Sequence, residues 1–256
     1  MRSLCVPAEP LLDILHEDDS FLVINKPAGL VCHPTRDGEL SSAIGRVRLY
    51  LGHAEGRFVN RLDRETSGVV VVARNGAVAG ELGRLFGRGA IEKCYLAVVH
   101  GHIAADVFTI DGPLGRDDGS PVAIKDRVRD DGAPARTKVR VLRRCLHDGL
   151  ECSLVELTPL SGRKHQLRIH LAHAGHPIVG DKLYGADEQI YLRFTTRSMT
   201  DADRQTLVFE HHALHAWRLQ FVWRSQTWRF EAPVPGYLAD FQSTVSAAVT
   251  GVHSIS

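Results

Sequence analysis

The sequence feature that most constrains the fold is a run of β-branched residues that follows directly on a polar loop. The run is Val-Val-Val-Val-Ala at positions 69–73, and the loop is Asn-Arg-Leu-Asp-Arg-Glu-Thr-Ser-Gly at positions 60–68. A short, unbroken run of β-branched residues predicts a strand that is buried on both faces. A polar loop attached to a rigid buried strand is a common position for a reacting side chain.

The carboxylate of Asp63 has arginines on both sides in this loop. Arg61 lies two residues before it and Arg64 directly after it. Nearby positive charge favours the ionised form of a carboxyl group, so we expect Asp63 to be charged. Two interpretations are open at this point: a reacting carboxylate, or an ion pair that only closes the loop.

Length and composition narrow the class of protein. The chain has 256 residues, of which 44% are apolar, so it can bury the core of one large or two small domains. The net charge of +1 is low for a nucleic-acid-binding protein, so any basic surface must be local. Five widely spaced cysteines predict reduced thiols. No signal-peptide pattern or membrane-length apolar run is present, so we expect a cytoplasmic protein that does not associate with membranes.

Periodicity, turn signals and capping residues predict the other elements. Strands are expected at residues 21–24, 93–101, 137–142, 150–157, 214–221 and 227–231, and helices at 41–51, 77–86 and 239–249. Lys26 falls in a turn at 25–29. Residues 111–135 and 186–206 are polar and are expected to be irregular. In the first of these, Lys125, Arg127 and Arg129 alternate and are candidate phosphate contacts.

Residues 157–175 predict a strand end, a glycine turn and a helix. Leu167, Leu171 and Ala174 form an apolar stripe at helical spacing, and Lys164 and Arg168 lie one turn apart along its edge. Arg168 is therefore expected to be half-buried. A half-buried guanidinium needs an anionic partner, and Asp63 is the partner that we predict.

Several of these stretches together resemble the RluA family of RNA pseudouridine synthases. The loop resembles the family motif His-Arg-Leu-Asp-Arg-x-Thr-Ser-Gly, except that Asn60 replaces the first His. Residues 14–34, the Lys-x-Tyr at 93–95, the Gly-Arg-x-His-Gln-Leu-Arg-x-His at 162–170 and residues 177–185 resemble further family signatures. The resemblance covers residues 11–241.

The resemblance implies an α+β fold, with a central, mostly antiparallel sheet flanked by helices and a cleft across its middle. It implies that Asp63 is the catalytic carboxylate, that Arg168 holds it, and that Tyr95 stacks on the uracil and helps to remove its C5 proton. Nothing is oxidised when uridine is isomerised, so no redox cofactor is expected. The expected substrate- and RNA-binding residues are Lys26, Arg61, Arg64, Thr66, Lys93, Arg163, Lys164 and His165.

The implied partner is structured RNA, either ribosomal or transfer RNA, in which the target uridine is flipped out of a stem-loop. We expect a monomer with one catalytic domain at residues 11–241, a flexible arm at 1–10 and a tail at 242–256. The sequence contains no separate small basic domain ahead of Leu11, so a stand-alone catalytic domain is expected.

Two other functions compete with this interpretation. A metal hydrolase would use some of the fourteen histidines, but the 165–176 segment contains no Glu between its histidines, so no metal is expected. A catalytically silent RNA-binding protein on the same fold is the main alternative. The joint presence of Asp63, Tyr95 and Arg168 argues against it.

Overall fold

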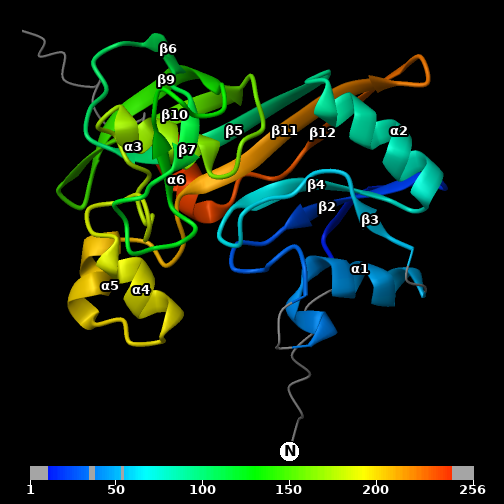
Figure 1. The fold of residues 1–256 in the computed structure, drawn as a ribbon, viewed down its shortest axis with the longest axis horizontal. Coiled ribbons are helices and arrows are strands. Elements are labelled where there is room, and N and C mark those ends of the chain that lie inside the picture. Colours follow the sequence, from blue (N-terminus) through cyan, green and yellow to red (C-terminus); the bar gives the residue numbers. More distant parts are fainter. Residues whose placement is uncertain (1–10, 35–37, 53–54, 244–256) are drawn as a thin grey trace, which may run out of the picture.

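A computed structural model describes residues 11–34, 38–52 and 55–243. A ten-stranded sheet forms its centre, with the strand order β1-β2-β4-β11-β5-β10-β9-β6, while β3 pairs with β4 and β12 pairs with β11 (Figure 1). The strands are β1 (Ile14–Glu17), β2 (Phe21–Lys26), β3 (Arg57–Phe58), β4 (Ser67–Ala73), β5 (Ile91–His100), β6 (Val107–Asp111), β9 (Arg136–His147), β10 (Leu150–Pro159), β11 (Leu214–Trp223) and β12 (Gln226–Glu231).

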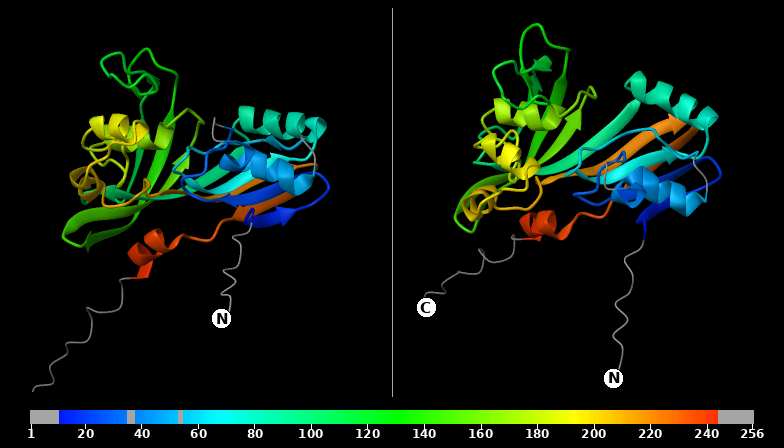
Figure 2. Two further views of the ribbon diagram at one scale, coloured as in Figure 1. Left: turned by 90° about the horizontal axis from the view of Figure 1, so that it is seen from below. Right: turned by 60° about the horizontal axis from the view of Figure 1, so that its bottom comes forward.

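The sheet is antiparallel except where β4 meets β11 in parallel. The helices are α1 (Ala43–Leu51), α2 (Gly76–Gly87), α3 (Gln166–His173), α4 (Gln189–Thr195), α5 (Asp201–Leu207) and α6 (Gly236–Ser243), with a short 3-10 helix at Glu39–Ser41. Figure 2 shows α1 and α2 at one end of the sheet and α3 to α5 at the other. The expected α+β fold is confirmed.

Strand β4 is buried along its whole length, as its β-branched sequence predicts. Val69 and Val71 pack into a cluster on one face of the sheet, whereas Val70 and Val72 pack into a separate cluster on the other. Burial of each such side chain contributes about 1.5–3 kcal/mol. The 60–68 loop is therefore anchored to one of the most deeply buried strands of the molecule.

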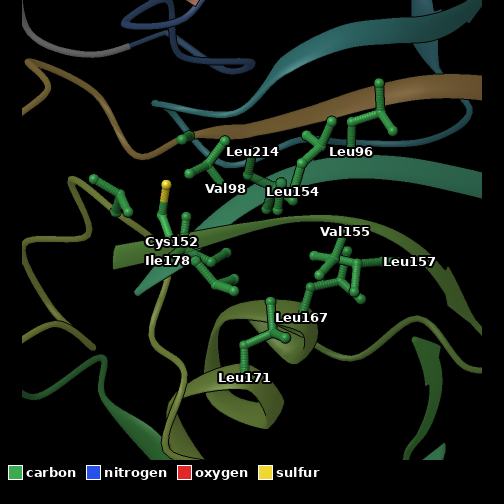
Figure 3. Packing of buried hydrophobic residues seen from close by; sticks show 14 of the residues in the cluster. Leu96, Val98, Cys152, Leu154, Val155, Leu157, Leu167, Leu171, Ile178 and Leu214 are labelled. Carbon is green, nitrogen blue, oxygen red and sulfur yellow. The ribbon is translucent and has the colours of Figure 1, made fainter. Parts of the chain in front are cut away.

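Helix α3 is held by a third cluster of apolar residues. Leu167 and Leu171 point from the helix toward Val155 and Leu157 of β10, as Figure 3 shows. The predicted apolar stripe is thus confirmed for these two residues. The helix begins only at Gln166, so Lys164 precedes it and does not lie one helical turn from Arg168.

Two segments that were expected to be irregular contain regular structure. Residues 186–206 include α4 and most of α5, because Thr200 and Asp203 form a capping box and because Ile190 and Leu207 are buried. Residues 111–135 include the short antiparallel pair β7 (Leu114–Arg116) and β8 (Asp126–Val128). The expected arm at 1–10 and nearly all of the expected tail lie outside the described residues.

Gly68 allows the close parallel approach of β4 and β11. Its φ is +112°, and a Cβ at this position would lie 2.2 Å from the carbonyl oxygen of Ala216.

We predict that Gly68→Ala lowers the free energy of unfolding by about 3 kcal/mol, because the backbone would be strained and the strands would separate. Gly83→Ala, on open space in α2, is the control and should stabilise the protein by up to about 1 kcal/mol. Urea unfolding measures both, and equal effects would contradict the prediction.

Candidate active site

A cavity of about 600 Å³ opens where the 60–68 loop, β5 and the turn before α3 meet. Nine of the eleven site residues predicted from the sequence line it; the two that do not are Lys26 and Arg64. The nine are Arg61, Asp63, Thr66, Lys93, Tyr95, Arg163, Lys164, His165 and Arg168. Residues that are more than 100 positions apart in the sequence therefore share one cavity.

Arg168 is in contact with two carboxylates at the floor of this cavity. Its Nη1 donates to Asp63 Oδ2 at 3.0 Å, and its Nε and Nη2 donate to the two oxygens of Asp181 at 2.7 and 2.8 Å. The ion pair with Asp63 agrees with the sequence prediction. The two-pronged pair with Asp181 was not predicted. Arg168 is also more buried than expected, with 8% of its side chain exposed.

The charges of these three groups stabilise one another. Burial alone would raise the pKa of Asp63, but the charge and hydrogen bond of Arg168, together with the neighbouring His165 and His212, hold that pKa below its ordinary value. Against the effect of burial, the same guanidinium lowers the pKa of Asp181 further, and the two carboxylates in turn raise the pKa of Arg168. All partners of the Asp63 carboxylate among the described residues contact Oδ2, namely Arg168 and, at 3.9 Å, His165. The other oxygen, Oδ1, is therefore available to a substrate.

Lys26 is a correction to the predicted RNA contacts. It is the last residue of β2, its side chain is fully buried, and it does not line the cavity. Its ammonium donates to the carbonyl oxygens of Pro27, Leu30 and Arg64 at 2.9, 2.7 and 3.0 Å. Burial lowers its pKa to about 8. Lys26 thus anchors the 60–68 loop through the carbonyl oxygen of Arg64, and its side chain has no exposed surface with which to contact RNA.

Glu65 is a second buried carboxylate in the loop, which the sequence analysis passed over in favour of Asp63. It accepts a hydrogen bond from Lys182 Nζ at 2.7 Å, and both side chains are at most 10% exposed. Burial would raise the pKa of Glu65, but the neighbouring His211, His212 and Lys182 lower it to about 2. Because Lys182 follows Asp181 directly, one dipeptide holds both Asp63, through Arg168, and Glu65.

Two buried histidines secure the end of the loop. Thr66 Oγ1 lies 2.7 Å from His212 Nε2, and Ser67 Oγ lies 2.8 Å from His215 Nδ1. Burial lowers the pKa of both histidines to about 4, so both are neutral at pH 7. Counting from Asp63 to Ser67, every residue of this part of the loop has a polar contact elsewhere in the protein.

Asn60 stands where the resembled family motif has His. Its side-chain amide donates to the carbonyl oxygen of Val69, and its side-chain oxygen accepts from the amide of Val71 at 2.8 Å. Asn60 therefore ties the start of the loop to the strand that follows it. Asn60 also lines the cavity.

Tyr95 and Lys93 reach the cavity from one face of β5, as strand alternation predicts. Burial, assisted by the negative charge of Asp63, raises the pKa of the Tyr95 phenol, which is therefore neutral. His165 reaches the cavity from a left-handed backbone conformation, with φ at +54°, just before α3. Its Nδ1 lies 2.9 Å from the Tyr184 hydroxyl.

Cations at the rim of the cavity have fewer ion-pair partners than those of the 125–129 segment, in which even the exposed Arg127 lies 3.8 Å from Asp117. Arg129 pairs with Asp131 and Asp118, and Lys125 pairs with Glu188 at 2.7 Å, so these two candidate phosphate contacts are already neutralised. At the rim, Arg61 and Arg163 are exposed and form no ion pair with any described residue. Lys164 pairs with Asp126 at 2.8 Å.

Within the described part of the chain, no group of three or more His, Cys, Asp or Glu side chains is arranged to hold a metal ion. None of the described helices is long and apolar enough to cross a bilayer.

A double-mutant cycle tests the Asp63–Arg168 contact. Asp63→Asn and Arg168→Ala each leave a buried charge with fewer partners, so the double variant should be more stable than the sum of the single effects by about 1–3 kcal/mol. Asp111 and Arg136 form an exposed ion pair and provide the control cycle, for which the coupling should stay below about 1 kcal/mol. Strict additivity at Asp63 and Arg168 in urea unfolding would show that the two side chains do not interact.

The histidines predict a pH dependence of stability. His212 and His215 titrate near pH 4 in the folded protein and near 6.5 when unfolded, so between these values the unfolded state binds more protons. The contribution of these two histidines to stability should therefore be constant above pH 6.5, and stability should fall by up to about 1.4 kcal/mol per pH unit for each histidine as the pH drops below it. His212→Asn should remove one histidine's share of this slope. Urea unfolding at pH 7, 6 and 5 measures it, and an unchanged slope would contradict the assignment.

Comparisons with known proteins match this chain to RNA pseudouridine synthases. A family described as RNA pseudouridylate synthase matches residues 20–173. The dual-specificity RNA pseudouridine synthase RluA of Vibrio vulnificus is 36% identical over 218 residues, which is 84% of each chain. Ribosomal large subunit pseudouridine synthase D of Xanthomonas campestris is 38% identical over 254 residues, covering 94% of this chain and 70% of the relative.

The chain spans a smaller part of some relatives, such as 63% of the uncharacterized RNA pseudouridine synthase YhcT of Bacillus subtilis. Among solved structures, the human RNA pseudouridylate synthase domain containing 1 superimposes with a TM-score of 0.70 at 30% identity, covering 88% of this chain and 85% of that one. Sequence and fold therefore agree, and the chain belongs to the RluA-type RNA pseudouridine synthases, which are isomerases.

Proposed function

We propose that this protein converts uridine to pseudouridine in a stem-loop of ribosomal or transfer RNA, with Asp63 as the catalytic carboxylate. The observation that carries the proposal is the Arg168 guanidinium, which holds Asp63 ionised at the floor of a cavity lined by Tyr95. A cavity of about 600 Å³ is large enough for a single nucleotide. A base inside a helix cannot reach it, so the uridine must be flipped out.

The reaction breaks the C1′–N1 bond, turns the uracil, and forms a C1′–C5 bond. The ionised Asp63 can begin it in one of two ways: Oδ1 attacks C1′ and displaces N1, or the carboxylate removes a proton from the sugar. Both routes need the carboxylate charged, which is the state that Arg168 favours. In either route the C5 proton is finally lost and N1 gains a proton, so no electrons are exchanged with a cofactor.

Tyr95 and the rim arginines have complementary roles in the proposal. The neutral Tyr95 ring stacks on the uracil, and its hydroxyl assists removal of the C5 proton. Arg61 lies on the exposed end of the loop, where it can fill the space that the flipped base leaves. Arg163 contacts the phosphate backbone beside it.

The central test is Asp63→Asn, which keeps the size of the side chain and removes its charge. We predict unchanged RNA affinity and a loss of single-turnover pseudouridine formation of at least about 10³-fold, as is typical for removal of a catalytic group. Asp19→Asn, on an exposed turn, is the matched control. Turnover by the Asp63 variant within tenfold of wild type would mean that another group performs the chemistry.

The RNA itself is identified by mapping pseudouridines in total RNA from cells with and without the gene. We expect at least one ribosomal or transfer RNA site to disappear and to return with the wild-type gene only. The names of the relatives RluA and ribosomal large subunit pseudouridine synthase D make ribosomal RNA the first place to look. An unchanged map would support a catalytically silent RNA-binding protein.

Salt dependence tests the rim contacts. Arg163→Gln should weaken RNA binding and flatten the log–log slope of affinity against salt by about 0.7, because it removes one phosphate contact to a single strand, and Arg61→Gln should weaken binding by removing the side chain that fills the vacated space. Arg129→Gln is the control, because that guanidinium already binds Asp118 and Asp131. If Arg129→Gln changed the salt dependence of RNA affinity more than the rim variants did, the phosphate contacts would have to be assigned to the 125–129 segment.

A further inference from the structure

A second cavity, of about 580 Å³, lies beside α4 and α5. No residue lines both cavities. Its apolar walls include Phe194, Met199 and Leu207, and its volume is in the range of sites that bind small molecules. The proposed catalysis does not use it.

The charged residues of this cavity are mostly cationic. Lys182, Arg197 and Arg204 line it, against the single carboxylate of Glu210. Among the described residues Arg197 forms no ion pair, and Arg204 has only Asp201, at 3.7 Å. The Lys182 ammonium lies 5.0 Å from the centre of the Phe194 ring. Cations beside apolar walls match a ligand that has an anionic group on an apolar body.

Positive φ angles of non-glycine residues occur at both cavities; that of Arg197 ends α4 in an ordinary left-handed turn, whereas that of Val208 is strained. Apart from the β-hairpin turns, the described non-glycine residues with positive φ are His165, Arg197 and Val208. His165 lines the catalytic cavity, and the other two line the second cavity. At Val208, φ is +68°, and the amide of Phe209 donates to the carbonyl oxygen of Leu207 at 2.8 Å, which makes a strained γ-turn. Such strain persists mainly at functional sites.

Lys182 connects the second cavity to the 60–68 loop. Its side chain is 4% exposed, and its ammonium holds Glu65, which is two residues after Asp63. An anion in the cavity would compete with Glu65 for this ammonium. Weakening of the Glu65 contact would loosen the loop on which Asp63 is positioned.

We propose that the second cavity binds a small anion with an aromatic or aliphatic body, and that its occupancy loosens the 60–68 loop through Lys182 and Glu65. The regulatory consequence rests on the proposed function of Asp63. The binding and the loosening of the loop do not, and both can be measured without any turnover.

Binding is tested with the fluorescent probe 8-anilinonaphthalene-1-sulfonate, an anion on an aromatic body. We expect one site, and an about tenfold weaker Kd in the double variant Arg197→Gln with Arg204→Gln, since two exposed cations are lost. Met199→Trp should block the site by filling it. Arg229→Gln, on β12, and Arg163→Gln, in the catalytic cavity, are controls that should leave the Kd unchanged.

Two results would overturn the binding proposal. One is an unchanged Kd in the double variant, and the other is a Kd that responds to Arg163→Gln instead, which would place the probe in the catalytic cavity. Inorganic phosphate at the same concentration should not displace the probe, because it lacks the apolar body. Displacement by phosphate would show that the cavity recognises charge alone.

Hydrogen exchange tests the link to the loop. Saturation with the probe should increase the amide exchange rate of residues 60–68 by at least about twofold in the wild type, and should leave it unchanged in the Met199→Trp variant, which cannot bind the probe. Binding without any change in exchange would overturn the link. Because this readout needs no activity, failure of the link is distinguishable from failure of the proposed catalytic role of Asp63.

Discussion

The buried guanidinium of Arg168 is the interaction on which the rest of the site depends. It joins three separate parts of the chain: α3, the 60–68 loop through Asp63, and the segment after α3 through Asp181. A buried arginine without partners would be very costly, so the fold must bring two carboxylates to it. Around it, the carboxylates of Asp63 and Asp181 pair with Arg168, and the neighbouring carboxylate of Glu65 pairs with Lys182, so that the buried charges of the site have partners of opposite sign.

The sheet provides the rigidity that this charge cluster needs. Strand β4 is buried on both faces, and its parallel approach to β11 at Gly68 fixes where the loop leaves the sheet. His212, two residues before β11, and His215, within it, then bind Thr66 and Ser67. The loop is thus held by backbone pairing at one end and by side chains along its length, and Asp63 is held by Arg168.

Local patterns predicted much of this from the sequence. The β-branched run at 69–73, the helix expected at 77–86 and the stripe of Leu167 and Leu171 are determined by near neighbours, and the structure has them all. The Asp63–Arg168 pair was also predicted, because a charge beside an apolar stripe requires a partner.

Partners that depend on the fold could not be predicted in the same way. Lys26 looked like a solvated turn residue, yet it is buried because three carbonyl groups converge on it. Asp181, Lys182, Glu65 and His212 gave little local signal beyond the resemblance of residues 177–185 to a family signature. Helices α4 and α5 were missed because their stability comes from the Thr200 capping box and a few buried contacts and not from a long apolar periodicity.

The most direct measurement of the central claim is a carbon-13 NMR titration of the Asp63 side-chain carboxyl group in the wild type and in Arg168→Lys, with Asp63→Asn to assign the signal. We predict that the pKa of Asp63 lies below the ordinary 3.8 in the wild type and rises clearly in Arg168→Lys, since lysine cannot hold Asp63 and Asp181 together. A pKa at or above 3.8 in the wild type, or one that does not respond to the change at Arg168, would contradict it.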